Sequence, residues 1–163
     1  MEKIFRNIFF ALALCCGFTA CSDDDDVIYS QWNADGEYNT AGTYSGTWTS
    51  TTGSTVTTAE GTLTLEATES TGVTKATSYC SDLGLDFYCV ANIVGVNDEY
   101  VFYNDNTDYI LEQVQTCITT ATTANSYEGT VSSENVATLS FTTIARSGRS
   151  TTTTYYSFEG TKQ

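Results

Sequence analysis

The chain has 163 residues, 40% of them hydrophobic, which is enough for one domain with a buried core. Six Lys plus Arg against twenty Asp plus Glu give a formal net charge of −14, which argues against nucleic-acid binding, because that needs a basic patch. Histidine and proline are absent, and without histidine the Ser-His and Cys-His nucleophiles and the usual zinc sites are excluded. We therefore expect a protein that is not an enzyme and that holds no metal or cofactor.

Residues 1–20 are typical of a bacterial signal peptide. Lys3 and Arg6 supply a positively charged beginning, and residues 8–18 form an apolar stretch. This stretch has the length found in signal peptides and is shorter than the ~20 residues of a membrane-spanning helix. A buried helix of the folded domain is the alternative, but residues 22–26 would end it abruptly in negative charge.

The sequence FTAC at residues 18–21 resembles the lipobox of bacterial lipoproteins. In that family the chain is cut before the cysteine, and the cysteine sulfur receives a diacylglycerol. Phe18 stands where leucine is usual, whereas Ala20 and Cys21 match the pattern. The resemblance implies lipid attachment at Cys21, and acyl chains on one cysteine, at ~0.8 kcal/mol per buried CH₂, suffice for membrane anchoring.

Residues 21–40 are expected to be the lipidated cysteine and an acidic, flexible tether. The sequence SDDDD after Cys21 resembles the acidic export tag of surface-exposed lipoproteins in Gram-negative bacteria. That resemblance implies an outer-membrane protein that faces the cell exterior, with the periplasmic face as the alternative. Residues 22–40 show no alternation of polar and apolar side chains, and they reach up to ~60 Å when extended.

Residues 41–163 are expected to form one all-β domain. Apolar and polar residues alternate in runs that turn-forming clusters separate, as strands of an antiparallel sheet do. In chain order these runs include GTYSGTWTS, TLTLEAT, FYCVANIVGV, YVFYN, YILEQVQTCIT, YEGTVSS, VATLSFTTIAR and TTTTYYSFEGT. Eight or nine strands joined by short turns predict an up-and-down antiparallel barrel, which leaves no open edges. A β-sandwich is the alternative. A membrane-spanning barrel is disfavoured, because the outward positions are mostly threonine and serine.

The first and last of these strands, AGTYSGTWTS and YYSFEGTKQ, resemble those of the lipocalin-like, or calycin-like, lipoproteins of Gram-negative anaerobes. In that family a Gly-Thr-Tyr-x-Gly-Thr strand begins an eight-stranded barrel, and the last strand closes back on it. The resemblance covers residues 41–163 in the length of the domain and the spacing of its strands, with specific identities in the two end strands. It implies a barrel with an open end that holds a small ligand, and it carries no catalytic residues.

Aromatic side chains are the main binding signal in the predicted barrel, although aromatic stripes in a small barrel more often belong to the core. Tyr100 shares a strand face with Phe102, and Tyr156 shares one with Phe158. Glu112 shares a predicted strand face with apolar residues, so an inward position is one alternative, although one inward carboxylate is not the pair that a glycosidase needs. The favoured alternative is that Glu112 pairs with a tyrosine hydroxyl or lies at the barrel mouth. The candidate ligand contacts are Trp48, Tyr44, Tyr100, Phe102, Glu112, Tyr156 and Phe158.

Two hypotheses for function follow from these patterns. The first is a surface lipoprotein whose barrel binds a small apolar or saccharide ligand, and it predicts an apolar cavity of ~300 Å³ or more. The second is a non-enzymatic structural or adhesion subunit, displayed on the surface, whose barrel core is filled by side chains. The expected partners are the membrane, through the lipid on Cys21, and a small molecule or glycan; nucleic acid is not expected.

Three cysteines remain once Cys21 is assigned to the anchor. The export route permits disulfides, and a hairpin turn at residues 83–84 is expected to bring Cys80 opposite Cys89. Such a bridge stabilises by roughly 2.5–3 kcal/mol on the chain-entropy estimate. A Cys89–Cys117 bridge and the absence of any bridge are the alternatives.

The sequence NDNTD at residues 104–108 carries several side-chain oxygens of the kind that calcium binds. It lacks the first Asp and the sixth-position Gly of a helix-loop-helix calcium loop. A hairpin turn is therefore expected there, and no metal site.

Overall fold

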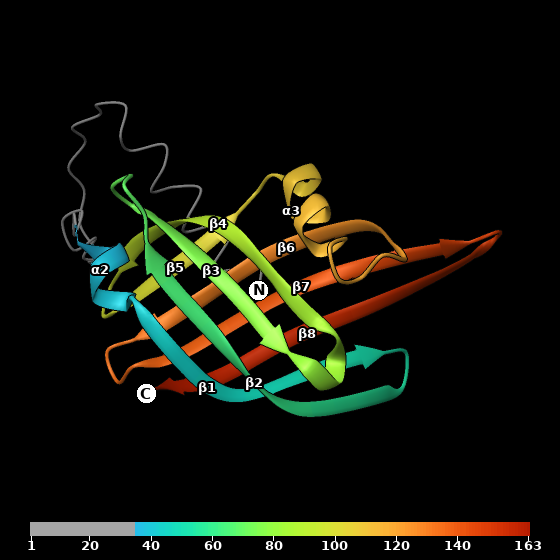
Figure 1. Ribbon diagram of the computed structural model, residues 1–163, viewed down its shortest axis with the longest axis horizontal. Helices are drawn as coiled ribbons and strands as arrows, with labels where there is room; N and C mark the ends of the chain where they lie inside the picture. The colour runs from blue at the N-terminus through green and yellow to red at the C-terminus, as the bar shows by residue number, and fades with distance from the viewer. Residues whose placement is uncertain (1–34) are drawn as a thin grey trace, which may run out of the picture.

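The computed structural model describes residues 35–163, which form a closed barrel of eight antiparallel strands in chain order (Figure 1). The strands are β1 (Gly42–Thr52), β2 (Thr55–Ala67), β3 (Val73–Cys80), β4 (Leu85–Val96), β5 (Glu99–Asn104), β6 (Ala121–Ser132), β7 (Val136–Ser147) and β8 (Ser150–Lys162). The helices are α2 (Gly36–Thr40), the 3-10 helix η1 (Ser81–Leu83) and α3 (Thr107–Val114). The predicted up-and-down, lipocalin-like barrel is confirmed, and the β-sandwich alternative is wrong.

Several predictions fall on residues that the structure does not describe. The signal peptide, Cys21 and residues 22–34 of the tether lie outside the described range. Within residues 35–163 no helix is long and apolar enough to cross a membrane.

Apolar and polar side chains alternate along the strands, which gives the barrel an apolar interior and an outer face that carries mostly hydroxyl groups. Rings fill the middle of the described interior: Trp48 lies 5.1 Å from Phe158 between ring centroids, and Phe87 lies 5.2 Å from Phe141. Tyr127 reaches across the barrel, and its hydroxyl donates a 3.3 Å hydrogen bond to the carbonyl of Ala76 on β3. Burying these side chains fixes the register of the strands that carry them, β1, β4, β6, β7 and β8, since a slip by one residue would turn them outward.

Three glycines stand side by side where β2, β1 and β8 meet. Gly46 is paired with Gly61 on β2 and with Gly160 on β8. A Cβ atom on Gly46 would lie 2.0 Å from the carbonyl oxygen of Glu159, and one on Gly61 would lie 2.6 Å from the Trp48 ring. The wall is therefore closely packed here because these residues have no side chains.

Helix α2 closes the barrel end at which β1 begins and β8 finishes (Figure 1). Glu37 is only 2% exposed, and its Oε2 accepts a 3.2 Å hydrogen bond from the backbone N–H of Gly72. Burial raises the pKa of Tyr44 to about 12, and its hydroxyl donates a 2.7 Å hydrogen bond to the Thr40 carbonyl. Residues 36–40, expected in the tether, are thus part of the folded domain.

The run YILEQVQTCIT, predicted as a strand, contains most of helix α3. Ile110 and Val114, one helical turn apart, are both fully buried against the barrel core. The side chain of Asn106 caps the helix by accepting a 3.1 Å hydrogen bond from the N–H of Tyr109. Apolar residues four apart suit a strand or a helix equally, which is why the sequence pattern did not distinguish the two. The hairpin turn predicted at residues 104–108 is wrong, because these residues lead into the start of α3. Glu112 is exposed on α3, so the alternative in which it points inward from a strand is wrong.

Helix α3 completes the barrel wall where β5 is too short. Pairing between β4 and β5 runs from Asn92 to Val96 of β4, so the first half of β4 lies beyond the end of β5. There the N–H of Val90 donates to the Tyr109 hydroxyl at 3.1 Å, and the Asn104 side-chain amide donates to the Val90 carbonyl at 2.7 Å. Side chains thus satisfy backbone groups that a longer strand would have paired.

Candidate functional site

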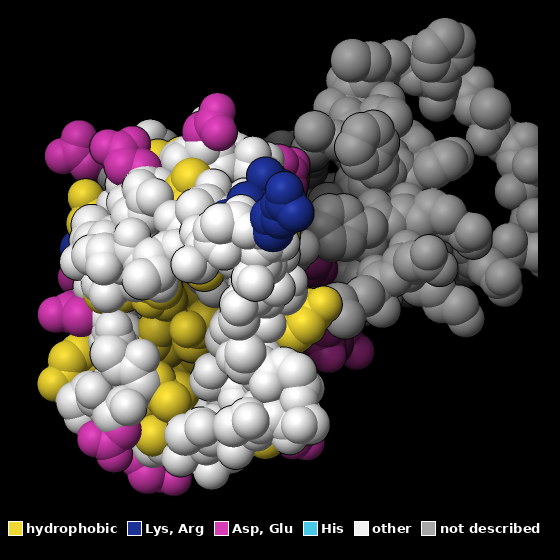
Figure 2. Space-filling view, turned by 90° about the vertical axis from the view of Figure 1, so that its right-hand side faces the viewer, with side chains coloured by type: hydrophobic (Ala, Val, Ile, Leu, Met, Phe, Trp, Pro, Cys, Tyr) yellow, Lys and Arg dark blue, Asp and Glu magenta, His cyan; other side chains and the backbone are white. Residues whose placement is uncertain are grey.

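The barrel end opposite α2 is open. Here the β1–β2 and β7–β8 hairpins project beyond the rest of the barrel (Figure 1). Figure 2 faces this end and shows a hollow with a hydrophobic floor between polar walls. Tyr156, which packs on the core yet keeps some exposure, lies on β8 on the way to this end, opposite Ser50 of β1 and Phe141 of β7.

The floor of the open end is a stack of two rings. Tyr156, half-buried, lies parallel to Phe141 with 4.7 Å between ring centroids and 11° between ring planes. Burial raises the pKa of the Tyr156 phenol, and hydrogen bonds with Ser50 and Thr143 oppose that shift. The phenol is thus neutral at physiological pH and is held in place by its neighbours on β1 and β7.

Hydroxyl groups line the wall above this floor. The register places Ser50 beside Tyr156, and one layer further out it places Thr52 beside Thr154 and Thr154 beside Thr143. The Thr52 and Thr154 hydroxyl oxygens are 2.8 Å apart, within hydrogen-bonding distance. An aromatic floor below fixed hydroxyls offers both an apolar contact and directed hydrogen bonds to a small ligand.

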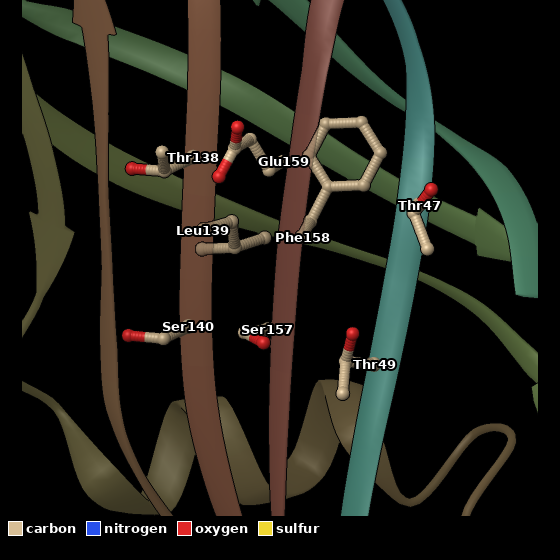
Figure 3. A pocket seen from close by; sticks show the side chains of 8 residues that line it. All are labelled: Thr47, Thr49, Thr138, Leu139, Ser140, Ser157, Phe158 and Glu159. Atoms are coloured by element: carbon tan, nitrogen blue, oxygen red, sulfur yellow. The ribbon is translucent and has the colours of Figure 1, made fainter. Parts of the chain in front are cut away.

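A second concavity, of about 510 Å³, lies on the outer face of β1, β7 and β8 (Figure 3). Its lining side chains are mostly outward ones, namely Thr47, Thr49, Thr138, Ser140, Ser157 and Glu159, with the interior residues Leu139 and Phe158 beneath. It is open, rich in hydroxyls and has one carboxylate. It exceeds the expected volume, but it is neither apolar nor inside the barrel, so we place no ligand there.

The candidate ligand contacts separate into three groups in the structure. Trp48, Phe158 and Tyr156 lie together below the open end, the first two fully buried. Phe102 is buried in the core, and Tyr44 and Tyr100 lie toward α2, where the Tyr100 hydroxyl accepts a 2.9 Å hydrogen bond from Asn39. Glu112 is remote from the interior. The sequence reasoning missed Ser50, Phe141 and Thr143, because only the strand register brings them to Tyr156.

The expected Cys80–Cys89 disulfide is wrong. Both cysteines are free, as is Cys117. The hairpin turn lies where expected, but it pairs Cys80 with Leu85, and it pairs Cys89 with Ala76. The two cysteines are thus four positions apart along the ladder, roughly 13 Å at ~3.3 Å per residue, whereas a disulfide needs Cα atoms within ~7 Å.

These positions predict the order in which the thiols react with iodoacetamide. Cys117 is partly exposed and is expected to react in the native protein. Cys80 and Cys89 are fully buried, and burial raises the pKa of Cys89 to about 12, so both should react only in urea. Peptide mass spectrometry measures each site. Failure of Cys80 and Cys89 to react even in urea without a reductant would show that they are bridged.

Comparisons with protein-family models, with curated proteins and with solved structures found no match for this chain. Within residues 35–163 no three His, Cys, Asp or Glu side chains gather closely enough to hold a metal ion. A barrel of this kind does not by itself define a function, so the proposal below rests on the chemistry of the open end.

Proposed function

We propose that this chain is a non-enzymatic lipoprotein of the Gram-negative outer membrane that binds a small ligand, most suitably a saccharide, at the open end of its barrel. In this proposal Cys21 carries the lipid, and the domain faces the cell exterior. The lipobox-like FTAC and the acidic run after it support the location. The chain enters the barrel at α2, at the end opposite the open one.

One observation carries the choice of ligand: the Tyr156–Phe141 stack lies beneath a wall of hydroxyls. A sugar ring has a C–H face that packs on an aromatic ring, and its hydroxyls exchange hydrogen bonds with Ser50, Thr52 and Thr154. A purely apolar ligand would displace water from the hydrogen-bonding sites that these hydroxyls do not use with one another or with Tyr156, and would not replace it, which costs binding free energy. A saccharide therefore suits this end better than a purely apolar molecule.

The test compares two adjacent tyrosines of β8. Tyr156 faces the open end, whereas Tyr155 lies on the outer face and is 58% exposed. Tyr156→Ala is expected to weaken the binding of trisaccharides at least tenfold, because it removes the ring contact, and Tyr155→Ala should stay within about twofold. Calorimetric titration of the full-length protein with maltotriose, cellotriose and trigalacturonic acid measures this. Equal losses in both variants would contradict the proposal.

The location has its own test. Mass spectrometry of the membrane fraction should find a mature chain that begins at an acylated Cys21, and protease added to intact cells should cleave it. An unlipidated chain that begins elsewhere would contradict the anchor. Cleavage only after lysis would place the domain on the periplasmic side.

A structural or adhesion subunit is the second candidate. The observation in its favour is the ring cluster of Trp48, Phe87, Tyr127 and Phe141, which fills the middle of the described interior. In that case the wild-type protein binds none of the three trisaccharides.

A further inference from the structure

Positive charge is concentrated at the open end of this acidic protein. Residues 49–58 and 142–157, which include both projecting hairpin tips, contain no Asp or Glu, although the chain has twenty. They contain two of its six Lys plus Arg, Arg146 and Arg149, and both are exposed at the tip of the β7–β8 hairpin. Figure 2 shows basic side chains beside the hollow, and acidic ones toward the edges of this face. The tip is thus the cationic pole of the open end.

The other bases in the described range lie elsewhere. Lys75 forms a 2.8 Å ion pair with Glu66 on the outer wall, and Lys162 contacts the Asn39 carbonyl near α2. Among residues 35–163 neither Arg146 nor Arg149 forms an ion pair. Their charge is therefore available to a partner.

The hairpin links this pole to the aromatic floor. The Phe141–Tyr156 pair and the Arg146–Thr151 pair are five positions apart on the β7–β8 ladder, roughly 17 Å at ~3.4 Å per residue. The inward positions between them are Thr143, Ala145, Thr152 and Thr154, most of which carry hydroxyls. A ligand that spans this distance meets hydroxyls rather than an apolar wall, which favours a short oligosaccharide over a fatty acid.

We infer that the ligand is an anionic oligosaccharide, with one ring on the Tyr156 floor and an acidic group at Arg146 and Arg149. This inference rests on the proposed saccharide site. Arg149 lies in the β7–β8 turn, and Arg146 lies near the end of β7, where it pairs with Thr151. Both are beyond the last pairing of β8 with β1 at Thr154. Guanidinium groups bind carboxylates and sulfates through paired hydrogen bonds, and the negative charge elsewhere on the protein directs such a ligand toward this pole.

The experiment uses the full-length protein in detergent, with trigalacturonic acid and maltotriose as the acidic and neutral probes. The wild type is expected to bind the acidic probe about tenfold more tightly at low salt, the effect of two exposed charge pairs, and less so as salt increases. The double variant Arg146→Gln/Arg149→Gln should lose this preference and keep its affinity for maltotriose. The matched control Lys75→Gln/Lys162→Gln removes the same charge elsewhere and should keep the preference within twofold.

Each contrary outcome has a definite meaning. Equal affinity for both probes, with both weakened by Tyr156→Ala, would overturn this inference and leave the proposed saccharide site standing. Loss of the preference in both double variants would overturn it too, because only net charge would then matter. Arginine-dependent binding to vesicles of phosphatidylglycerol, without binding of trigalacturonic acid, would make the tip a membrane contact. If neither probe binds, both proposals fail.

Discussion

Gly46→Ala is expected to lower the free energy of unfolding by about 3 kcal/mol, the upper part of the range for overpacking. The new Cβ would lie 2.0 Å from the Glu159 carbonyl oxygen and 2.4 Å from the Gly160 Cα. These are backbone atoms of β8, so no rotation of a side chain can relieve the contact. The strand that closes the barrel has to move away from β1.

Thr49→Ala is the control for this substitution. Thr49 is on the same strand, faces outward and lines only the open outer groove. Its loss should change the unfolding free energy by no more than about 0.5 kcal/mol. Urea unfolding followed by circular dichroism measures both variants. Equal stability of Gly46→Ala and the wild type would contradict the close contact between β1 and β8.

Phe141→Ala is expected to lower the free energy of unfolding by about 4 kcal/mol. The Phe141 ring is 1% exposed, and it contacts four other rings: those of Trp48, Phe87, Tyr127 and Tyr156. Its removal leaves a cavity where β7 meets the middle of the core. The loss is a large part of the 5–15 kcal/mol that stabilises a typical domain.

Tyr155→Ala is the matched control, since it deletes an exposed aromatic ring from the neighbouring strand and should cost less than about 1 kcal/mol. Phe141→Ala also removes the support beneath Tyr156. At temperatures at which the Phe141→Ala variant is still folded, it should therefore bind trisaccharides at least tenfold more weakly than the wild type. Wild-type affinity in this variant would show that the stack does not form the floor.

Much of the barrel could be predicted from the sequence because alternation and turn positions are local signals. Runs such as VATLSFTTIAR place every second residue in the core, and short turns require neighbouring strands to pair in sequence. Helix α3 was missed because Ile110 and Val114 satisfy two periodicities. The cap at Asn106 and the acid at Asp108 in the first turn were the signals that could have identified it.

The site was harder to predict because it depends on cross-strand register. Tyr156 was singled out, but its neighbours come from β1 and β7, more than ten residues away in the chain. The same dependence on register explains why the predicted Cys80–Cys89 disulfide was wrong. The turn between the two cysteines was placed correctly, but a bridge would need a strand register four positions different from the observed one. Trp48 and Tyr44 were expected as contacts, but both are fully buried, Trp48 among the core rings and Tyr44 against α2 at the closed end.

Chemical-shift mapping tests most directly whether the open end binds the ligand. We expect titration of ¹⁵N-labelled full-length protein with trigalacturonic acid to shift the amide signals of Ser50, Thr143 and Tyr156. The signals of Glu37 at the closed end, and of Thr138 in the outer groove, should stay unchanged. Shifts confined to the α2 end or to the outer groove, or none at saturating concentration, would contradict the account.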